Sequence, residues 1–269
     1  MADFLTEMAR ASRERAKAAR AAGYSTVDLA SLPLHPPDID ATGFGLIAEA
    51  KLAGPASGRL VRSGEDDVAV VDLARSYADG GASMVSVLTE PLRFDGSLDH
   101  LRSVANSIQL PVMRKDFLVD PIQILEARAH GASGVLLIAR ILSSDQLVEM
   151  VETADRLGMF SLVEVFDEED LDLASATFSL GVMVGVNSRD LTDLSVDRGR
   201  LGRLRPLIPD HLVSVAESGL ETSSAIQLVV ELGYRMALVG AALSSADDPV
   251  AATNRMVMAG RSAARAVAT

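Results

Sequence analysis

Short apolar runs recur along the chain at the spacing of alternating strands and helices. Their starts lie roughly 22 to 38 residues apart, which leaves room for one strand, one helix and two loops each time. This repeat predicts an α/β fold, a single (β/α)8 barrel of the TIM-barrel type. The expected strands are residues 45–51, 83–89, 110–115, 134–139, 160–165, 182–187, 212–218 and 236–240.

Helical patterns fill the intervals between these runs, and most of them open near a capping residue and stop at a glycine. The expected helices are 65–79, 97–107, 120–131, 143–158, 167–181, 197–208, 221–233 and one that begins near Pro249. Residues 1–22 also carry apolar side chains at helical spacing, ahead of the first strand. We therefore expect one domain over 1–269, with an N-terminal helical extension (1–43) packed on a barrel (44–269).

Composition excludes several classes of function. Cysteine is absent, which rules out disulfides, thiolate catalysis and cysteine-based zinc sites. The four histidines do not pair at metal-ligand spacing, and we expect them on the surface or in loops. A net charge of −12 argues against a nucleic-acid partner. Since no apolar run approaches the roughly 20 residues of a membrane span and no secretory signal is evident, we expect a cytoplasmic protein that does not bind membranes.

Polar residues stand at the ends of most of the apolar runs, where barrel enzymes carry their catalytic groups. Glu49 and Lys51 lie two apart and so face the same way; the wet end of the barrel lumen tolerates such a pair, while the helix layer does not. Lys115, if partly desolvated near other charges, can act as a general acid. Glu164 lies between apolar neighbours and needs either a partner or a raised pKa. The remaining candidates at strand ends are Asn187, Glu217 and Ser218.

Structural explanations compete with these functional ones. Glu49 and Lys51 would then form an ion pair that supports the barrel, Lys115 would be a solvated loop residue, and Glu164 would belong to a salt bridge.

Two further features are suited to binding an anion. Arg189 follows the sixth run and can clamp a carboxylate or phosphate, although it also fits ordinary loop chemistry. Gly219 and Gly240 follow the last two strands, where glycine lets backbone N–H groups approach a phosphate at the start of a short helix. The alternative for both glycines is a tight turn without a ligand.

Taken together, several strings resemble the indole-3-glycerol phosphate synthase family, and the similarity extends from about residue 44 to 245. The segment from RKDF to EARAHGA is long and specific. The strings are IAEAK (47–51), SVLTEPLRFDGSL (86–98), MRKDFLVDPIQILEARAHGA (113–132), LVEV (162–165), GVNSRDL (185–191), VAESGL (215–220) and LVGAAL (238–243).

The resemblance implies a carbon–carbon lyase that closes an indole ring. The family converts 1-(2-carboxyphenylamino)-1-deoxyribulose 5-phosphate to indole-3-glycerol phosphate, carbon dioxide and water, and it implies neither a metal nor an organic cofactor. It assigns the proton donor at the forming alkoxide to Lys115, with Glu164 as the candidate acid–base group for loss of the hydroxyl. Lys51 would contact the phosphate or the substrate carboxylate, and Glu49 would hold the anilino nitrogen or act as a base.

The same resemblance places the other candidates around the substrate. Asn187, Glu217 and Ser218 would fix the reacting hydroxyls and their water. The phosphate would lie on backbone amides around Gly219 and Gly240, with Arg189 close by. Ala241 and Phe94 are also expected to contact the substrate or its phosphate. The partner is thus an anionic sugar phosphate, and we expect a monomer or a weak homodimer.

One loop departs from the family pattern. After the first strand the family usually reads K-R-x-S-P-S, whereas residues 51–56 here read K-L-A-G-P-A. The loss of two hydroxyls is expected to weaken binding by about 1 kcal/mol for each lost hydrogen bond. This leaves open a diverged copy with altered substrate preference, or a binding protein that has lost turnover. A phosphoribosylanthranilate isomerase ranks lower, because that family usually uses a Cys/Asp pair and cysteine is absent here.

Overall fold

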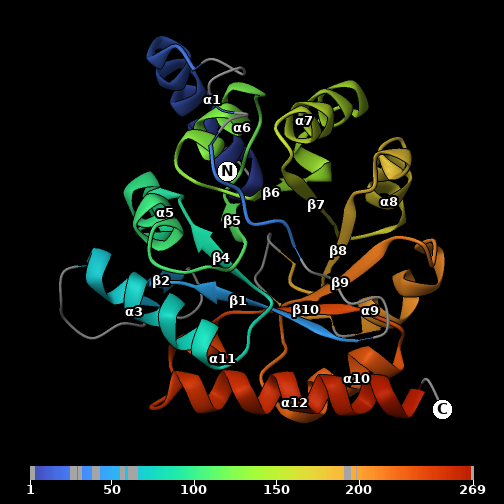
Figure 1. Cartoon of the computed structure of the whole chain (residues 1–269). Helices are drawn as coiled ribbons and strands as arrows, with labels where there is room; N and C mark the ends of the chain where they lie inside the picture. The colour runs from blue at the N-terminus through green and yellow to red at the C-terminus, as the bar shows by residue number, and fades with distance from the viewer. Residues whose placement is uncertain are drawn as a thin grey trace.

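A closed barrel of parallel strands forms the centre of the molecule, and helices surround it (Figure 1). The computed structural model describes residues 4–24, 29, 32–37, 43–54, 58–59, 66–190, 195–197 and 199–267. Around the barrel the strands follow the order β1-β10-β9-β8-β7-β6-β5-β4. The strands are β1 (Gly45–Ala50), β4 (Met84–Leu88), β5 (Val112–Lys115), β6 (Gly134–Ile138), β7 (Phe160–Val165), β8 (Met183–Asn187), β9 (Val213–Glu217) and β10 (Met236–Val239). The predicted TIM barrel is confirmed, and each strand begins and ends close to the expected residues.

One main helix follows each barrel strand and returns the chain to the start of the next. These helices are α3 (Asp66–Asp79), α5 (Leu98–Ala105), α6 (Ile122–Ala129), α7 (Ser144–Arg156), α8 (Glu168–Ser175), α9 (Gly199–Leu204), α10 (Ser223–Glu231) and α12 (Pro249–Val267). Shorter elements lie in the loops between the main strands and helices. They are the hairpin β2 (Ala53–Gly54) and β3 (Gly58–Arg59), the helices α4 (Pro91–Phe94) and α11 (Ala241–Ser244), and the 3-10 turns η1 (Ala139–Ile141), η2 (Phe178–Leu180) and η3 (Arg205–Leu207).

The expected helices 167–181 and 197–208 are about half as long as the sequence pattern indicates. The segment 197–208 ends as an α-helix at Leu204 and continues as the turn η3, because Pro206 has no N–H and disfavours the helical conformation of the residue before it. The segment 167–181 ends as an α-helix at Ser175, and both the amide and the hydroxyl of Thr177 then donate to the carbonyl of Ala174.

Successive side chains along each strand point in turn to the helix layer and to the barrel lumen, which gives two separate apolar regions. On β1, Leu46, Ala48 and Ala50 face the helix layer, while Ile47 faces the lumen. The lumen is filled from the other strands as well, chiefly by Met84, Met113, Leu136, Leu162, Met183, Val215, Met236 and Leu238. Several of these are methionines, whose flexible side chains fill irregular gaps. Because apolar residues pack the lumen below, the polar residues at the strand ends are confined to the upper rim.

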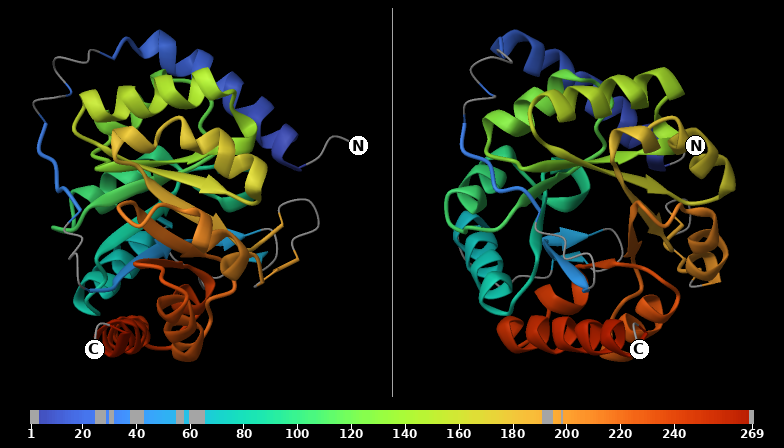
Figure 2. Two further views of the ribbon diagram at one scale, coloured as in Figure 1. Left: turned by 90° about the vertical axis from the view of Figure 1, so that its right-hand side faces the viewer. Right: turned by 45° about the vertical axis from the view of Figure 1, so that its right-hand side comes forward.

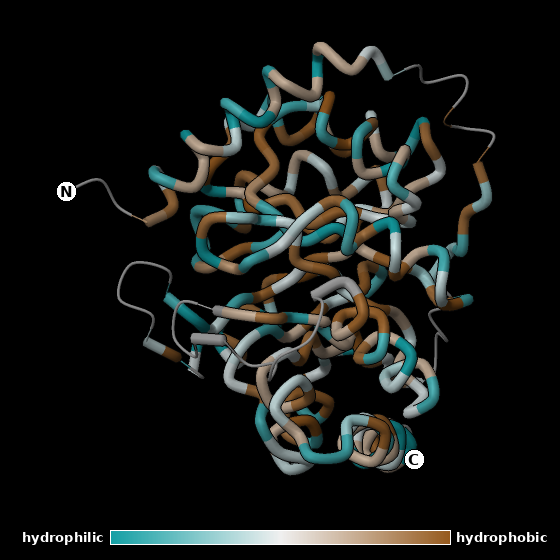
Figure 3. Tube along the Cα trace, turned by 90° about the vertical axis from the view of Figure 1, so that its left-hand side faces the viewer, coloured by the Kyte–Doolittle hydropathy of each residue, from teal (hydrophilic) through white to brown (hydrophobic). Residues whose placement is uncertain are grey.

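The N-terminal helix α1 (Phe4–Ala22) lies on the opposite side of the molecule from α12 (Figure 2). Hydrophilic and hydrophobic residues alternate along it, as Figure 3 shows. Its buried side includes Leu5 and Met8, which join the lumen cluster beside Phe117. This confirms the expected helix at the N-terminus, packed on the barrel; the division of the chain at residue 43 stays a prediction. No helix among the described residues has the length and apolar character to cross a membrane.

Candidate active site

A lysine and two glutamates from three different strands converge at the upper rim of the barrel. The Nζ atom of Lys115, at the end of β5, lies 3.8 Å from Oε2 of Glu164 on β7. The same Nζ atom lies 3.9 Å from Oε2 of Glu49 on β1. At these distances the charges attract one another as ion pairs, without the short contacts of a direct hydrogen bond. Residues far apart in the sequence therefore meet at one rim, as the strand-end pattern predicts.

Lys51 completes a chain of alternating charge with Glu49. Its Nζ atom lies 3.2 Å from Oε1 of Glu49, so one carboxylate is shared by two ammonium groups. Burial alone would raise the pKa of Glu49, but Lys51 and Lys115 outweigh that effect and hold it below its ordinary value of 4.5. Glu49 is therefore an ionised carboxylate. The Lys51–Glu49 pair is therefore part of a larger charged cluster that includes Lys115.

The charge on Lys115 is stabilised by its surroundings. Burial alone would lower the pKa of this ammonium group. The three carboxylates around it, with Glu164 contributing most, outweigh burial and raise the pKa above its ordinary value of 10.5. Lys115 is consequently a protonated, partly desolvated cation that can donate a proton to a developing oxyanion.

The pKa of Glu217, at the end of β9, is shifted in the direction opposite to that of Glu49. Burial and the neighbouring Glu164 carboxylate raise the pKa of Glu217 well above its ordinary value of 4.5, although Lys115 acts in the other direction. Its Oε1 atom has no hydrogen-bond partner among the described residues, and neither has Oε2 of Glu164. Two buried carboxyl groups, each with one oxygen that lacks a hydrogen-bond partner in the described part of the chain, thus lie close to Lys115.

Two glycines make room for the acidic side chains. A Cβ atom added to Gly185 on β8 would lie 2.0 Å from Oε1 of Glu217. A Cβ atom added to Gly240, after β10, would lie 2.4 Å from Oε1 of Glu49. The Glu49 carboxylate thus fills the space beside Gly240 that a side chain would occupy. The spacing of charges at the rim therefore depends on the absence of side chains at both positions.

Asn187 and Arg189 lie on the loop that follows β8. Oδ1 of Asn187 accepts a hydrogen bond of 2.9 Å from the amide of Arg189, and its carbonyl accepts one of 2.8 Å from Nη1 of Arg200. Arg189 is near enough to Glu49 to contribute to lowering its pKa. Both residues therefore face the same rim, although the carboxamide oxygen of Asn187 is already used to shape its own loop.

The turn after β9 contains two consecutive residues in the left-handed region. Ser218 has φ 67° and Gly219 has φ 68°. Glycine adopts this conformation freely, whereas serine is strained there, at a cost on the order of 1–2 kcal/mol. The hydroxyl of Ser188 donates to the carbonyl of Ser218 at 3.0 Å and helps hold the turn. Strain retained at a strand end beside acidic groups is typical of functional turns.

The other predicted anion contacts lie at the end of β10. Gly240 caps the short helix α11, and Ala241 is its exposed first residue. Both residues lie at the start of α11, where backbone N–H groups without intrahelical partners can bind a phosphate. The loop after β1, whose sequence differs from the family pattern, is only partly described. Leu52 and Ala53 are buried, and residues 55–57 lie outside the described residues.

Aromatic side chains form an apolar wall next to the charged rim. The ring of Phe94 lies 6.3 Å from that of Phe117, and Phe4 from α1 meets Phe117 edge to face at 5.8 Å. Phe94 was expected from the family resemblance. Phe4 and Phe117 were missed, although Phe117 belongs to the RKDF string and Phe4 opens the apolar stripe of the N-terminal helix.

Two expectations about histidine were wrong. His100 and His130 are buried, because His100 lies on the inner face of α5 and His130 caps α6, with its Nδ1 atom 2.7 Å from the carbonyl of Glu126. Sequence reasoning could not place them, since both lie on helices whose inner faces are set by packing. The described residues hold no group of acidic or histidine side chains arranged to bind a metal ion.

Comparison with known proteins connects this geometry to one family. The sequence model described as indole-3-glycerol phosphate synthase matches residues 31–256. The indole-3-glycerol phosphate synthase of Mycobacterium avium (strain 104) is 41% identical over 259 residues, which cover 96% of this chain and 91% of that protein. The Mycobacterium tuberculosis (strain CDC 1551 / Oshkosh) protein of the same name is 40% identical over the same shares. A crystal structure of 3-hexulose-6-phosphate synthase has a TM-score of 0.65 at 18% identity, over 80% of this chain and 99% of that one, which supports the fold alone.

Proposed function

The chain belongs to the indole-3-glycerol phosphate synthase family and is a carbon–carbon lyase of that type, and from this premise we propose how its rim closes the indole ring. The alternative of a non-catalytic sugar-phosphate-binding barrel receives no support from the comparisons. The observation that carries the proposal is the convergence of Lys115, Glu49 and Glu164 within ion-pair distance at one barrel mouth.

The first step forms a carbon–carbon bond. The aromatic carbon that bears the carboxylate attacks the ketone carbon of the ribulose chain, and negative charge develops on the ketone oxygen. Lys115 donates its proton to this oxygen as the charge develops, and Glu49 and Glu164 keep the lysine protonated beforehand. Loss of carbon dioxide then returns an electron pair to the ring and restores its aromaticity.

The second step removes the new hydroxyl as water. The hydroxyl leaves with a proton, for which Glu164 is our candidate, and the adjacent carbon of the new ring loses a proton to a base. Burial and the neighbouring Glu164 raise the pKa of Glu217, which favours its protonated form as a hydrogen-bond donor to the departing oxygen. Asn187 and Ser218 would orient the hydroxyls and their water. The overall reaction consumes one proton, since a carboxylate anion becomes neutral carbon dioxide.

The remaining parts of the substrate fit the rest of the rim. The anilino ring would lie on the wall made by Phe94 and its neighbours, with the anilino nitrogen near Glu49. Lys51 would contact the substrate carboxylate or phosphate. The phosphate would lie on backbone amides near Gly219, Gly240 and Ala241, with Arg189 close by. We further propose that the chain acts in the cytoplasm as a monomer or weak homodimer, on an anionic sugar phosphate.

An ultraviolet assay of the purified chain with 1-(2-carboxyphenylamino)-1-deoxyribulose 5-phosphate tests the proposal. We expect an indole chromophore to form with one equivalent of carbon dioxide. The product analogue, titrated in parallel, separates binding from turnover. Tight binding without carbon dioxide release would contradict the assigned chemistry and favour a binding protein.

Stability should depend on pH through Glu217. Its folded-state pKa is raised, so its contribution is fully favourable below the ordinary value of 4.5 and is lost as pH rises toward the folded-state pKa. Glu217→Gln removes this effect, since the amide cannot ionise. We expect the variant to gain stability relative to wild type as pH rises from 4.5 to 8. Urea unfolding at both pH values measures the gain, and identical pH dependence in the two proteins would contradict it.

A further inference from the structure

We propose that Arg15, on the N-terminal helix, is a positioning residue for ring closure. It fastens the two loops that flank Lys115, so that the ammonium group and the aromatic wall keep their places. This inference rests on the function proposed above and adds a residue from outside the barrel to it.

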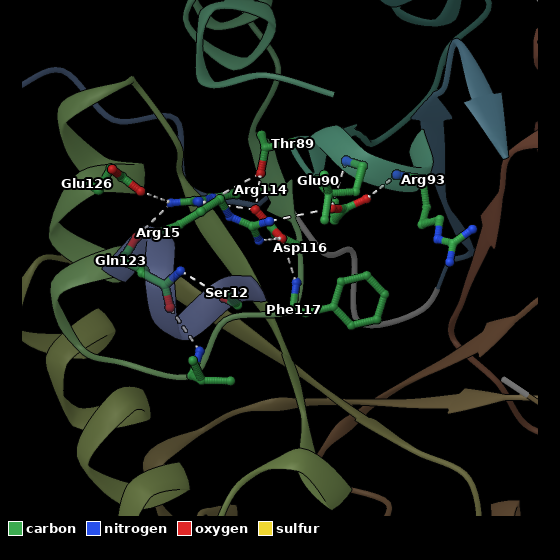
Figure 4. A network of polar contacts seen from close by, with 12 residues as sticks. Ser12, Arg15, Thr89, Glu90, Arg93, Arg114, Asp116, Phe117, Gln123 and Glu126 are labelled. Carbon is green, nitrogen blue, oxygen red and sulfur yellow. Dashed lines mark hydrogen bonds and ion pairs between the residues drawn. The ribbon is translucent and has the colours of Figure 1, made fainter. Parts of the chain in front are cut away.

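Arg15 bridges two buried carboxylates that come from different loops. Its Nη2 atom donates to Oδ1 of Asp116 at 2.5 Å, and its Nη1 atom donates to Oε1 of Glu90 at 3.4 Å. The carboxylate side chains are 1% and 0% exposed, while that of Arg15 is 25% exposed. Figure 4 shows the guanidinium between these partners. Charged hydrogen bonds in so dry a setting are stronger than surface pairs and fix geometry.

The Asp116 contact acts directly on the backbone beside Lys115. Oδ1 of Asp116 also accepts from the amide of Phe117 at 2.8 Å, and Oδ2 accepts from the hydroxyl of Thr89 at 2.8 Å. On the other side of Lys115, Arg114 donates to Asp116 at 3.2 Å and to Thr89 at 3.0 Å. Both chain neighbours of the lysine are therefore anchored in one network, and Arg15 connects it to α1.

The Glu90 contact acts on the second loop. Glu90 is the N-cap of α4, and its two carboxylate oxygens accept from the amides of Leu92 at 2.9 Å and Arg93 at 2.7 Å. The short helix α4 ends at Phe94, whose ring packs on Phe117. Arg15 therefore contacts Glu90, which caps the helix that ends at Phe94. It also contacts Asp116, which directly precedes Phe117.

A second pair provides a matched control on the same helix and loop. Arg20 donates to Oδ2 of Asp120 at 2.6 Å, but its side chain is 63% exposed. Exposed ion pairs contribute little, because water and salt screen them. Asp120 lies beyond the residues that flank Lys115. Removing Arg20 thus breaks one contact between α1 and the loop after β5 but leaves the network at the rim unchanged.

The experiment compares Arg15→Ala, Arg15→Lys and Arg20→Ala in the full chain. Steady-state kinetics give kcat and KM for indole formation, and thermal unfolding checks that each protein is folded at the assay temperature. We expect Arg15→Ala to lower kcat by about tenfold or more at saturating substrate, because small misplacements of catalytic groups have large effects. Arg15→Lys should recover part of the loss, and Arg20→Ala should remain within about twofold of wild type, as expected for an exposed pair.

Hydrogen exchange provides a readout that does not depend on turnover. The amides of Phe117, Leu92 and Arg93 bond to the two carboxylates that Arg15 holds. They should exchange faster in Arg15→Ala than in Arg20→Ala. Equal exchange in the two variants, or equal kcat in the two, would overturn the positioning role. A wild-type chain without indole formation would instead refute the proposed function, and the exchange comparison would still decide whether Arg15 orders the two loops.

Discussion

Lys115→Met is expected to lower kcat for indole formation by about 1,000-fold, within the 10²–10⁴ range that one general acid contributes. The thioether has similar length and no proton to donate. The developing alkoxide would then depend on water, and the carboxylates that now surround the ammonium group would oppose the negative charge instead of supporting its donor. Steady-state kinetics of purified wild type and variant measure the change.

The variant should remain folded and should still bind the substrate analogue reduced at its ketone. Glu49 retains Lys51 at 3.2 Å and so keeps a cationic partner in the variant. Lys17→Met is the matched control, because Lys17 is an exposed lysine paired with Glu14 on α1. It should leave kcat unchanged. A Lys115→Met protein with kcat within tenfold of wild type would show that the proton comes from elsewhere.

Arg114→Met is expected to produce the largest loss of stability, about 3–5 kcal/mol, as is typical when one partner of a buried ion pair is removed. Arg114 is 2% exposed and donates to four groups: Thr89 Oγ1, the Gln123 carbonyl, Glu126 Oε2 and Asp116 Oδ2. Methionine fills part of the volume but leaves buried acceptors without a donor. For a chain of this size the melting temperature should fall by about 10 °C.

Urea unfolding at neutral pH measures this loss. Arg102→Met serves as the control, because Arg102 forms an exposed pair with Asp99 at 3.6 Å on α5. It should change stability by less than about 0.5 kcal/mol. A loss below about 1 kcal/mol for Arg114→Met would mean that the network is replaceable by apolar packing, as happens in some proteins when whole ion-pair sets are exchanged.

The sequence was sufficient to predict the barrel and the residues that meet at its rim. Apolar runs at a regular interval determine the strands, and a charged residue on the lumen-facing register at a strand end can only point into the mouth. This reasoning placed Glu49, Lys115 and Glu164 on one rim, which the interatomic distances confirm. The catalytic roles of these residues stay predictions.

The supporting network could not be predicted, for a geometrical reason. Arg114 lies on the outward face of its strand, where a hydrophobic residue is the ordinary expectation. Its partners come from the turn after β4, from the next loop and from α6, and Arg15 adds a helix nearly a hundred residues upstream. No local pattern relates such segments. The place of Gly185 beside Glu217 likewise follows from the stagger between β8 and β9, which periodicity does not reveal.

The pairing of β1 with β10 has a consequence for synthesis of the chain. Ile47 is in register with Leu238, so the ring of strands cannot close until the last barrel strand, β10, has left the ribosome. Until then Glu49 lacks its neighbour Gly240, and β1 and β9 both present open edges. We therefore expect chains that stop before β10 to lack activity and to self-associate through these open edges.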